Sequence, residues 1–221
     1  LANEQVLGDG TCERSGDPVE QRDMEQWFYR ITAYAQQLLD DMDSVDWPEK
    51  VKVMQRHWIG RSEGAEFGLP VAEADGSARE DVAPLAVFTT RPDTSFGMTF
   101  AVISPEHPRV DELTTDNERA TVDAFRASVA GRSEIDRLST EGSLDKRGVA
   151  TGCRVVNPFT GQAIPVFLAD YVLMTYGTGA IMAVPGEDQR DWDFAVAHGC
   201  EIIRTVQPPD DFHGEAYVGE G

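Results

Sequence analysis

The chain has 221 residues, enough to bury one sizeable core with a smaller appended region. Its 19 Lys and Arg residues face 39 Asp and Glu residues, and the formal net charge of -20 argues against a protein that grips long nucleic acid by neutralising phosphates. Three scattered cysteines favour a reducing compartment, and no apolar run reaches the ~18 residues of a membrane span. We therefore expect a cytoplasmic protein with no membrane partner.

The first 60 residues are predicted to form a helical flank. Residues 24–42 carry apolar side chains at intervals of three and four, which is the spacing of an amphipathic helix, and a second helix is predicted from Trp47 to about Gly60. Because this block is too small to bury its own apolar face, we expect it to dock on a larger domain. Both ends of the chain read as the middle of longer segments, so we also expect an excised part of a longer protein.

From residue 61 onward the pattern changes to short strands interleaved with helices. Strands are predicted at residues 66–72, 83–89, 99–103, 149–156, 162–168, 180–184 and 201–206. Helical segments are predicted at residues 105–113, 117–130 and 133–138 and after residue 188, and the basic residues between 132 and 147 read as a solvated face. The pattern predicts a mixed α/β fold: a β-barrel-like core of about six strands surrounded by helices, with the N-terminal helical flank. The predicted domains are residues 1–60 and residues 61–221.

A threonine-rich loop, residues 89–98, joins the strand that ends near residue 89 to the strand that begins near residue 99. Its first six residues are Thr89-Thr90-Arg91-Pro92-Asp93-Thr94. Loops at strand ends often carry binding and catalytic side chains. An ordinary proline turn stabilised by Ser and Thr side chains explains the same composition, so the loop by itself leaves both interpretations open.

A second informative stretch covers residues 176–194. Glycines permit tight turns before a short apolar strand at residues 180–184, and a Pro-Gly pair ends that strand. Asp188 is a good N-cap for the helix that follows, and Asp191 comes three residues later. Backbone N–H groups beside two carboxylates predict a socket for a ligand with a charged amine. The alternative is that both acids only cap the helix and favour its dipole.

No motif of covalent catalysis is present. The chain has neither a Gly-x-Ser-x-Gly elbow nor a phosphate-binding P-loop, and its four histidines do not fall at metal-ligand spacing. Cys12 and Ser15 have the spacing of half a zinc knuckle without a second pair, so neither a metal nor a cofactor is predicted. An enzyme with these carboxylates and hydroxyls would orient water and substrate.

The two stretches together resemble the signatures of the editing domain inserted into class I aminoacyl-tRNA synthetases. Within that group they resemble the bacterial-type leucyl-tRNA synthetase family. In this chain the second stretch reads Gly177-Thr178-Gly179-Ala180-Ile181-Met182-Ala183-Val184-Pro185-Gly186-Glu187-Asp188-Gln189-Arg190-Asp191. Residues 54–65 resemble the segment that joins the family's catalytic core to this insertion. The HIGH and KMSKS motifs are absent, so no amino-acid activation is expected.

The resemblance implies post-transfer editing, in which oriented water hydrolyses the ester between a wrong amino acid, such as norvaline, and the 3′-terminal adenosine of leucine tRNA. It implies that Asp191 holds the α-ammonium group of the substrate. Thr89 and Thr90 would hydrogen-bond the ribose or the reacting ester and position water. Thr94 would be the wall against which the branched side chain of leucine clashes.

Five further substrate-binding positions follow from the same resemblance. Met182 and Val184 would line the pocket, Tyr176 would contact the terminal adenosine, Arg91 would face its phosphate or the loop, and Asp188 would stand beside the ammonium site. The implied partners are the 3′ end of aminoacylated leucine tRNA, small aminoacyl-adenosine analogues and the rest of the synthetase in cis, with no cofactor.

One position departs from the family pattern, because Glu187 stands where many members carry a histidine. The alternative to an esterase is a binding module. In that case the isolated chain would hold a tRNA 3′ end or an aminoacyl-adenosine ligand without turning it over, and its acidic charge favours weak tRNA binding.

Overall fold

The computed structural model describes residues 1, 5–20, 25–130, 137, 147–174 and 177–219. The chain divides into two compact units. One unit is Arg22–Glu63, and the other combines Leu1–Gln21 with Gly64–Gly221. Among the described residues, no helix is long and apolar enough to cross a lipid bilayer.

The smaller unit holds two helices, α1 (Ala35–Asp40) and α2 (Glu49–Ile59), and α2 ends at Gly60 in a left-handed conformation. The single helix predicted over residues 24–42 is wrong: of the described residues 25–42, only those of α1 are α-helical, and two short 3-10 turns flank it. Large aromatic side chains of this unit are exposed, Trp27 and Trp58 among them. A short helix with an unburied apolar face gains little from packing, which explains why the helix is interrupted.

The larger unit is built on a four-stranded sheet. In spatial order its strands are β4 (Gly148–Val156), β5 (Ala163–Ala169), β3 (Phe100–Ile103) and β6 (Ala180–Ala183). The β3–β5 pair is parallel, and the other two pairs are antiparallel. A separate antiparallel pair consists of β1 (Ala65–Leu69) and β2 (Leu85–Thr89).

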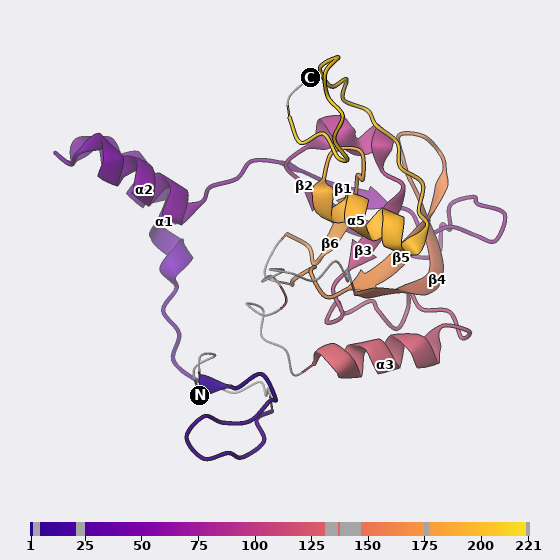
Figure 1. The fold of residues 1–221 in the computed structure, drawn as a ribbon, viewed down its shortest axis with the longest axis horizontal. Coiled ribbons are helices and arrows are strands. Elements are labelled where there is room, and N and C mark those ends of the chain that lie inside the picture. The colour runs from indigo at the N-terminus through magenta and orange to yellow at the C-terminus, as the bar shows by residue number, and fades with distance from the viewer. Residues whose placement is uncertain (2–4, 21–24, 131–136, 138–146, 175–176, 220–221) are drawn as a thin grey trace. The chain divides into compact units, whose positions relative to one another are not determined.

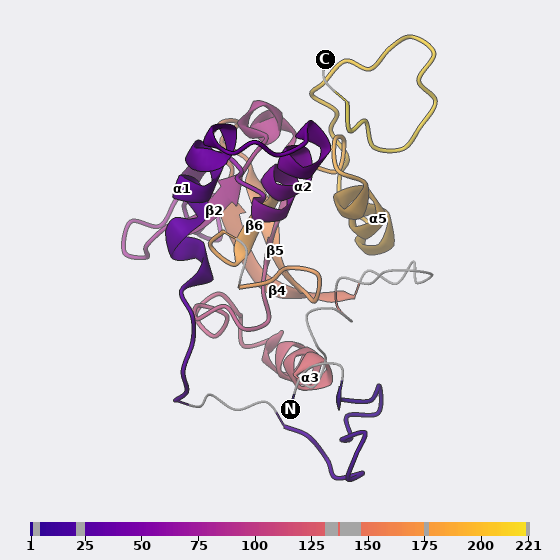
Figure 2. The same cartoon turned by 90° about the vertical axis from the view of Figure 1, so that its left-hand side faces the viewer.

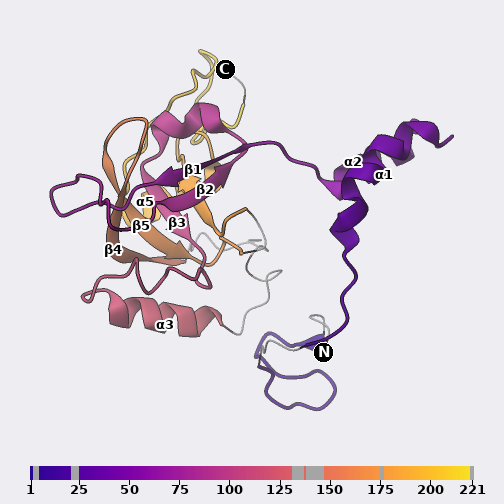
Figure 3. The same ribbon diagram turned by 180° about the vertical axis from the view of Figure 1, so that it is seen from behind.

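Two layers cover the four-stranded sheet. Helix α5 (Gln189–His198) lies on one side and the β1–β2 pair on the other, as Figures 1 and 3 show from opposite directions. Alternation along β3 places Phe100 against Phe194 of α5 and places Ile103 in the cluster that contains Val87 of β2. Helix α3 (Arg119–Val129) lies beside β4 and contributes to that second cluster (Figure 2).

The predicted mixed α/β class, with about six strands accompanied by helices, is confirmed. The described strands form two sheets and no closed barrel, so the sheet is barrel-like only in a loose sense. Residues 105–113 are a run of turns where a helix was predicted, because Pro105 begins the run and Pro108 has no N–H for a helical hydrogen bond. The predicted helix at residues 133–138 falls outside the described residues except for Arg137.

The strand predicted at residues 201–206 is also wrong, since this segment has no regular structure. Two of its backbone N–H groups, those of Thr205 and Val206, donate to the carboxylate of Glu187. These donors are therefore not available for a neighbouring strand.

Candidate functional site

The threonine-rich loop and the start of α5 meet at one end of the four-stranded sheet. Because β3 and β6 are antiparallel, the residue that precedes β3 lies beside the residue that ends β6: Thr99 N–H donates to Ala183 O at 3.2 Å. A Cβ added at Gly97 would lie 3.3 Å from Oε2 of Glu187. The C-terminal end of the loop therefore contacts the turn that leads into α5.

The other end of the loop begins beside the opening turn of β6. Strand β2 lies against β6, and the hydroxyl of Thr178 donates to Ala86 O at 2.7 Å. Gly177 has a positive φ of 58°, and a Cβ there would lie 3.1 Å from Cβ of Phe88. Thr89, the last residue of β2, is next in the chain, so the loop starts near one end of β6 and finishes near the other.

The loop is held in shape by its own polar groups. The hydroxyl of buried Thr94 donates to Arg91 O at 2.8 Å, and the Thr89 hydroxyl accepts from Arg91 N–H at 3.0 Å. The Arg91 guanidinium binds the carboxylate of Asp93 at 2.8 Å. Residues Pro92–Gly97 form a 3-10 turn, and Thr90 is exposed. This is the stabilised proline turn that composition alone allowed, and Thr90 is free of these internal contacts.

Asp188 is the N-cap of α5, as predicted. Its Oδ1 accepts from the backbone N–H groups of Arg190 at 2.8 Å and Asp191 at 3.2 Å. An aspartate in this position stabilises a helix by about 0.5–2 kcal/mol relative to alanine. The helix ends at Gly199, which takes the left-handed conformation typical of a helix C-terminus.

Asp191 is buried in the first turn of α5 and is bound to the end of β6. Its Oδ2 accepts from Val184 N–H at 2.9 Å, and the Tyr171 hydroxyl lies 3.5 Å from its Oδ1. Burial, together with the smaller effect of the Asp188 charge, raises the pKa of Asp191 from 3.8 to about 7, while the Val184 N–H opposes the shift. A cation brought by a ligand would strongly stabilise the ionised form of a carboxylate in this setting.

The raised pKa makes part of the stability depend on pH. Between about pH 4 and pH 7 the folded chain keeps a proton on Asp191 that the unfolded chain releases, so this contribution to the free energy of unfolding is present in full at low pH. It is lost as the pH rises through that window, by at most about 1.4 kcal/mol per pH unit. Urea unfolding of the wild type and of Asp191→Asn across the window should show a steeper fall for the wild type. Parallel curves would contradict the raised pKa.

The apolar residues of the predicted site lie under the loop. Met182 and Val184 are buried in the same cluster as Val87 of β2 and Met98, the residue that follows the 3-10 turn. Tyr176 lies outside the described residues. Among the residues that the structure describes, no hydrogen bond joins Asp191 to a threonine of the loop, and the shared pocket stays a prediction.

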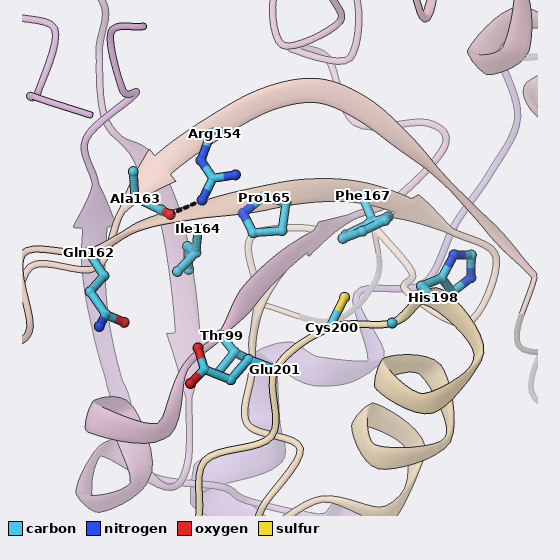
Figure 4. A pocket seen from close by; sticks show the side chains of 11 residues that line it. Thr99, Arg154, Gln162, Ala163, Ile164, Pro165, Phe167, His198, Cys200 and Glu201 are labelled. Atoms are coloured by element: carbon cyan, nitrogen blue, oxygen red, sulfur yellow. Dashed lines mark hydrogen bonds between the residues drawn. The ribbon is translucent and has the colours of Figure 1, made fainter. Parts of the chain in front are cut away.

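A hollow of about 480 Å³ lies elsewhere, between the start of β5 and the segment that follows α5 (Figure 4). Phe167 and His198 are among the residues that line it, and no residue of the predicted site does. The buried hydroxyl of Thr99 also lines it and has no hydrogen-bond partner within the described part of the chain. This hollow is therefore separate from the predicted editing site.

Sequence reasoning missed two side chains that support the site. Tyr171 packs against Phe194 and points its hydroxyl at Asp191; nothing in its sequence neighbourhood marks it. Arg137 is buried, so its placement on a solvated face is wrong. It donates to the carbonyl oxygens of Asp170 and Val172 and pairs with Glu106 at 2.8 Å, which anchors the chain around Tyr171.

Comparison with known proteins identifies the family to which the chain belongs. Residues 56–221 match the family described as "Leucyl-tRNA synthetase, editing domain". Leucine–tRNA ligases of Saccharopolyspora erythraea and Rubrobacter xylanophilus are each 51% identical to the chain, over 236 and 226 residues, and each alignment covers 100% of it. The chain spans 24% and 26% of the length of these two relatives.

A solved structure is similar as well. It is the ternary complex of Agrobacterium radiobacter K84 agnB2 LeuRS with tRNA and LeuAMS, which is 40% identical and superposes with a TM-score of 0.68. The match covers 97% of this chain and 25% of that one. The chain thus belongs to the leucyl-tRNA synthetase family, and residues 56–221 match the editing domain of that family.

Proposed function

We propose that this chain is the part of a leucine–tRNA ligase that hydrolyses the ester of mischarged leucine tRNA, with norvaline as one of the amino acids removed. The observation that carries the proposal is the buried carboxylate of Asp191, held at the end of β6 beside the turn that the threonine-rich loop contacts. The family of the chain supports an editing role in general, and the residues below supply the chemistry.

Asp191 binds the α-ammonium group of the aminoacyl ester. The pair forms away from bulk water, where opposite charges attract more strongly than at the surface. The incoming ammonium lowers the pKa of the carboxyl group again, so the bound state carries the ionised acid. Asp188 holds the helix start in place through its cap, and its own charge adds to the negative field at the site.

The threonines orient the reacting groups. Thr90, which is exposed at the head of the loop, and Thr89 hydrogen-bond the ribose or the ester and direct a water molecule at the carbonyl carbon. The water oxygen bonds to that carbon, the bond to the ribose oxygen breaks, and one proton of the water passes to the ribose oxygen. The products are the free amino acid and a tRNA with its terminal hydroxyl restored.

Side-chain selection falls to the buried part of the site. Met182 and Val184 provide an apolar floor for an unbranched side chain, and Thr94 stands as the wall that excludes the branched side chain of leucine. One methylene changes binding by only about 1–3 kcal/mol, which is why a second, hydrolytic sieve is needed after aminoacylation.

The rest of the synthetase delivers the tRNA. The net charge of -20 makes this chain a poor binder of the tRNA body, so we assign it the terminal adenosine alone, with Tyr176 and Arg91 as its contacts. The exposed aromatic residues of the helical unit, Trp27 and Trp58 among them, form the surface that docks on the remaining ligase.

A turnover assay beside a binding assay decides between an esterase and a binding module. Release of norvaline from norvalyl-tRNA is measured for the isolated chain and for the full-length ligase. Binding of a non-hydrolysable 3′-aminoacyl-adenosine analogue to each protein is measured by calorimetry. We expect both proteins to bind the analogue and both to release norvaline. Binding without turnover by the isolated chain would make this chain a binding module, and turnover by neither protein would contradict the esterase.

A further inference from the structure

We propose that Glu187 is a positioning residue of the editing site: its carboxylate fastens the segment after α5 against the end of the threonine-rich loop and thereby fixes the turn that carries Thr94. The proposal rests on the proposed function for its meaning in catalysis. Its structural part can be tested without any turnover.

The carboxylate of Glu187 binds two successive backbone donors. Glu187 is buried in the turn between β6 and α5, with 6% of its surface exposed. Its Oε1 accepts from Thr205 N–H at 2.6 Å and from Val206 N–H at 3.1 Å. Its own N–H donates to Val184 O at 2.9 Å. The side chain therefore joins the end of β6 directly to the return segment, the stretch of residues 200–206 that follows α5.

The junction leaves no space for additional side chains. A Cβ at Gly97 would lie 3.0 Å from Ile203 O and 3.0 Å from Cγ2 of Thr205, in addition to its approach to Glu187. A Cβ at Gly186 would lie 2.3 Å from Ile203 O. Gly186 is therefore required by close approach, and an alanine at Gly97 would force its neighbours to shift by a few tenths of an ångström. The loop, the turn and the return segment meet at this point.

A second buried group also holds the loop. The side-chain amide of Asn157, which is fully buried, donates to Ser95 O at 3.1 Å and to Met98 O at 3.3 Å. The 3-10 turn with Thr94 is thus held by Asn157 and, at Gly97, approached by the Glu187 junction. Loss of the Glu187 carboxylate would leave two N–H groups unpaired and would remove one of these two supports.

The experiment compares Glu187→Ala, Glu187→Gln and Gly97→Ala in the full-length ligase, with Glu201→Gln as the matched control. Glu201 is an exposed carboxylate on the same return segment. Amide hydrogen exchange is followed at Thr205 and Val206 and at Met98, whose N–H donates to Ser95 O. The kcat and KM for hydrolysis of norvalyl-tRNA are measured on the same samples.

We expect Glu187→Ala to accelerate exchange at all three amides by about tenfold, a change that corresponds to the net free energy of one lost hydrogen bond. We also expect this variant to lower kcat more than it raises KM. Glu187→Gln keeps an acceptor oxygen and should restore most of both quantities, and Glu201→Gln should change neither. Gly97→Ala strains the junction from the loop side, so its effect should not add to that of Glu187→Ala.

Three results would overturn the proposal. Unchanged exchange at positions 205 and 206 in Glu187→Ala would show that the carboxylate does not hold the return segment. Faster exchange there with unchanged exchange at Met98 would show that the loop is independent of it, and altered exchange with unchanged kcat and KM would remove the catalytic meaning. Should Glu187→Ala not fold, Gly97→Ala decides the matter: faster exchange at all three amides supports the junction, and unchanged exchange there would overturn it. A wild-type ligase without hydrolysis would refute the proposed function instead, while exchange still tests the junction.

Discussion

Replacing Asp191 with alanine should nearly abolish deacylation of mischarged leucine tRNA, with kcat/KM reduced by roughly 10²–10⁴-fold. The magnitude follows from the cost of leaving one partner of a buried charge pair alone, about 3–5 kcal/mol. In this chain the partner left alone would be the ammonium group of the substrate, because the Asp191 carboxylate is buried at the start of α5.

Asp191→Asn separates the charge from the structural role. An asparagine oxygen can still accept from Val184 N–H, so the junction of β6 and α5 is retained while the negative charge is lost. Asp193→Asn on the same helix is the control, since Asp193 is only partly buried and binds the side chain of Gln189. Unchanged hydrolysis in purified, folded Asp191→Ala would contradict the ammonium assignment.

Replacing Thr94 with alanine should open the pocket to correctly charged leucyl-tRNA. We expect hydrolysis of that substrate to rise by about 10–200-fold, the range that one methylene is worth in a tight pocket, while hydrolysis of norvalyl-tRNA changes little. The measurement is single-turnover deacylation of both esters by the full-length ligase. Continued sparing of leucyl-tRNA would reject Thr94 as the filter.

Two matched variants distinguish the wall from the hydrogen bond. Thr94 is fully buried and its hydroxyl donates to Arg91 O, so alanine removes both a methyl group and a structural contact. Thr94→Ser keeps the hydroxyl and removes the methyl group, and Thr94→Val keeps the volume and removes the donor. If volume is the filter, Thr94→Ser should admit leucine and Thr94→Val should not. The opposite ranking would assign discrimination to the loop conformation.

Turn and cap residues made part of the fold predictable. A Gly-rich turn precedes β6 and a Pro-Gly pair follows it, while Asp188 caps the start of α5 and Gly199 its end. Each of these residues determines the conformation of its immediate neighbours in the sequence. The class of the fold followed from the alternation of such elements. The separation of the strands into two sheets depends on long-range pairing that single-strand patterns do not encode.

The errors have their causes in distant contacts. The apolar pattern at residues 201–206 predicted a strand, yet its donors are taken by Glu187, a residue some eighteen positions away. Arg137 looked like a surface residue because burial of an arginine depends on acceptors far along the chain, here the carbonyl oxygens of Asp170 and Val172. The acidic socket at the start of α5 was predicted from the residues themselves, the roles of the other site residues came from family resemblance, and the supporting contacts came only from the structure.

The 2.9 Å hydrogen bond from Val184 N–H to Asp191 gives the protein a built-in spectroscopic probe. The proton of that amide senses the charge on the carboxylate at close range, so its chemical shift follows both protonation and the arrival of a cation. A titration observed at this single nucleus would therefore report amine recognition in a silent, non-hydrolysable complex, without any label on the nucleic acid.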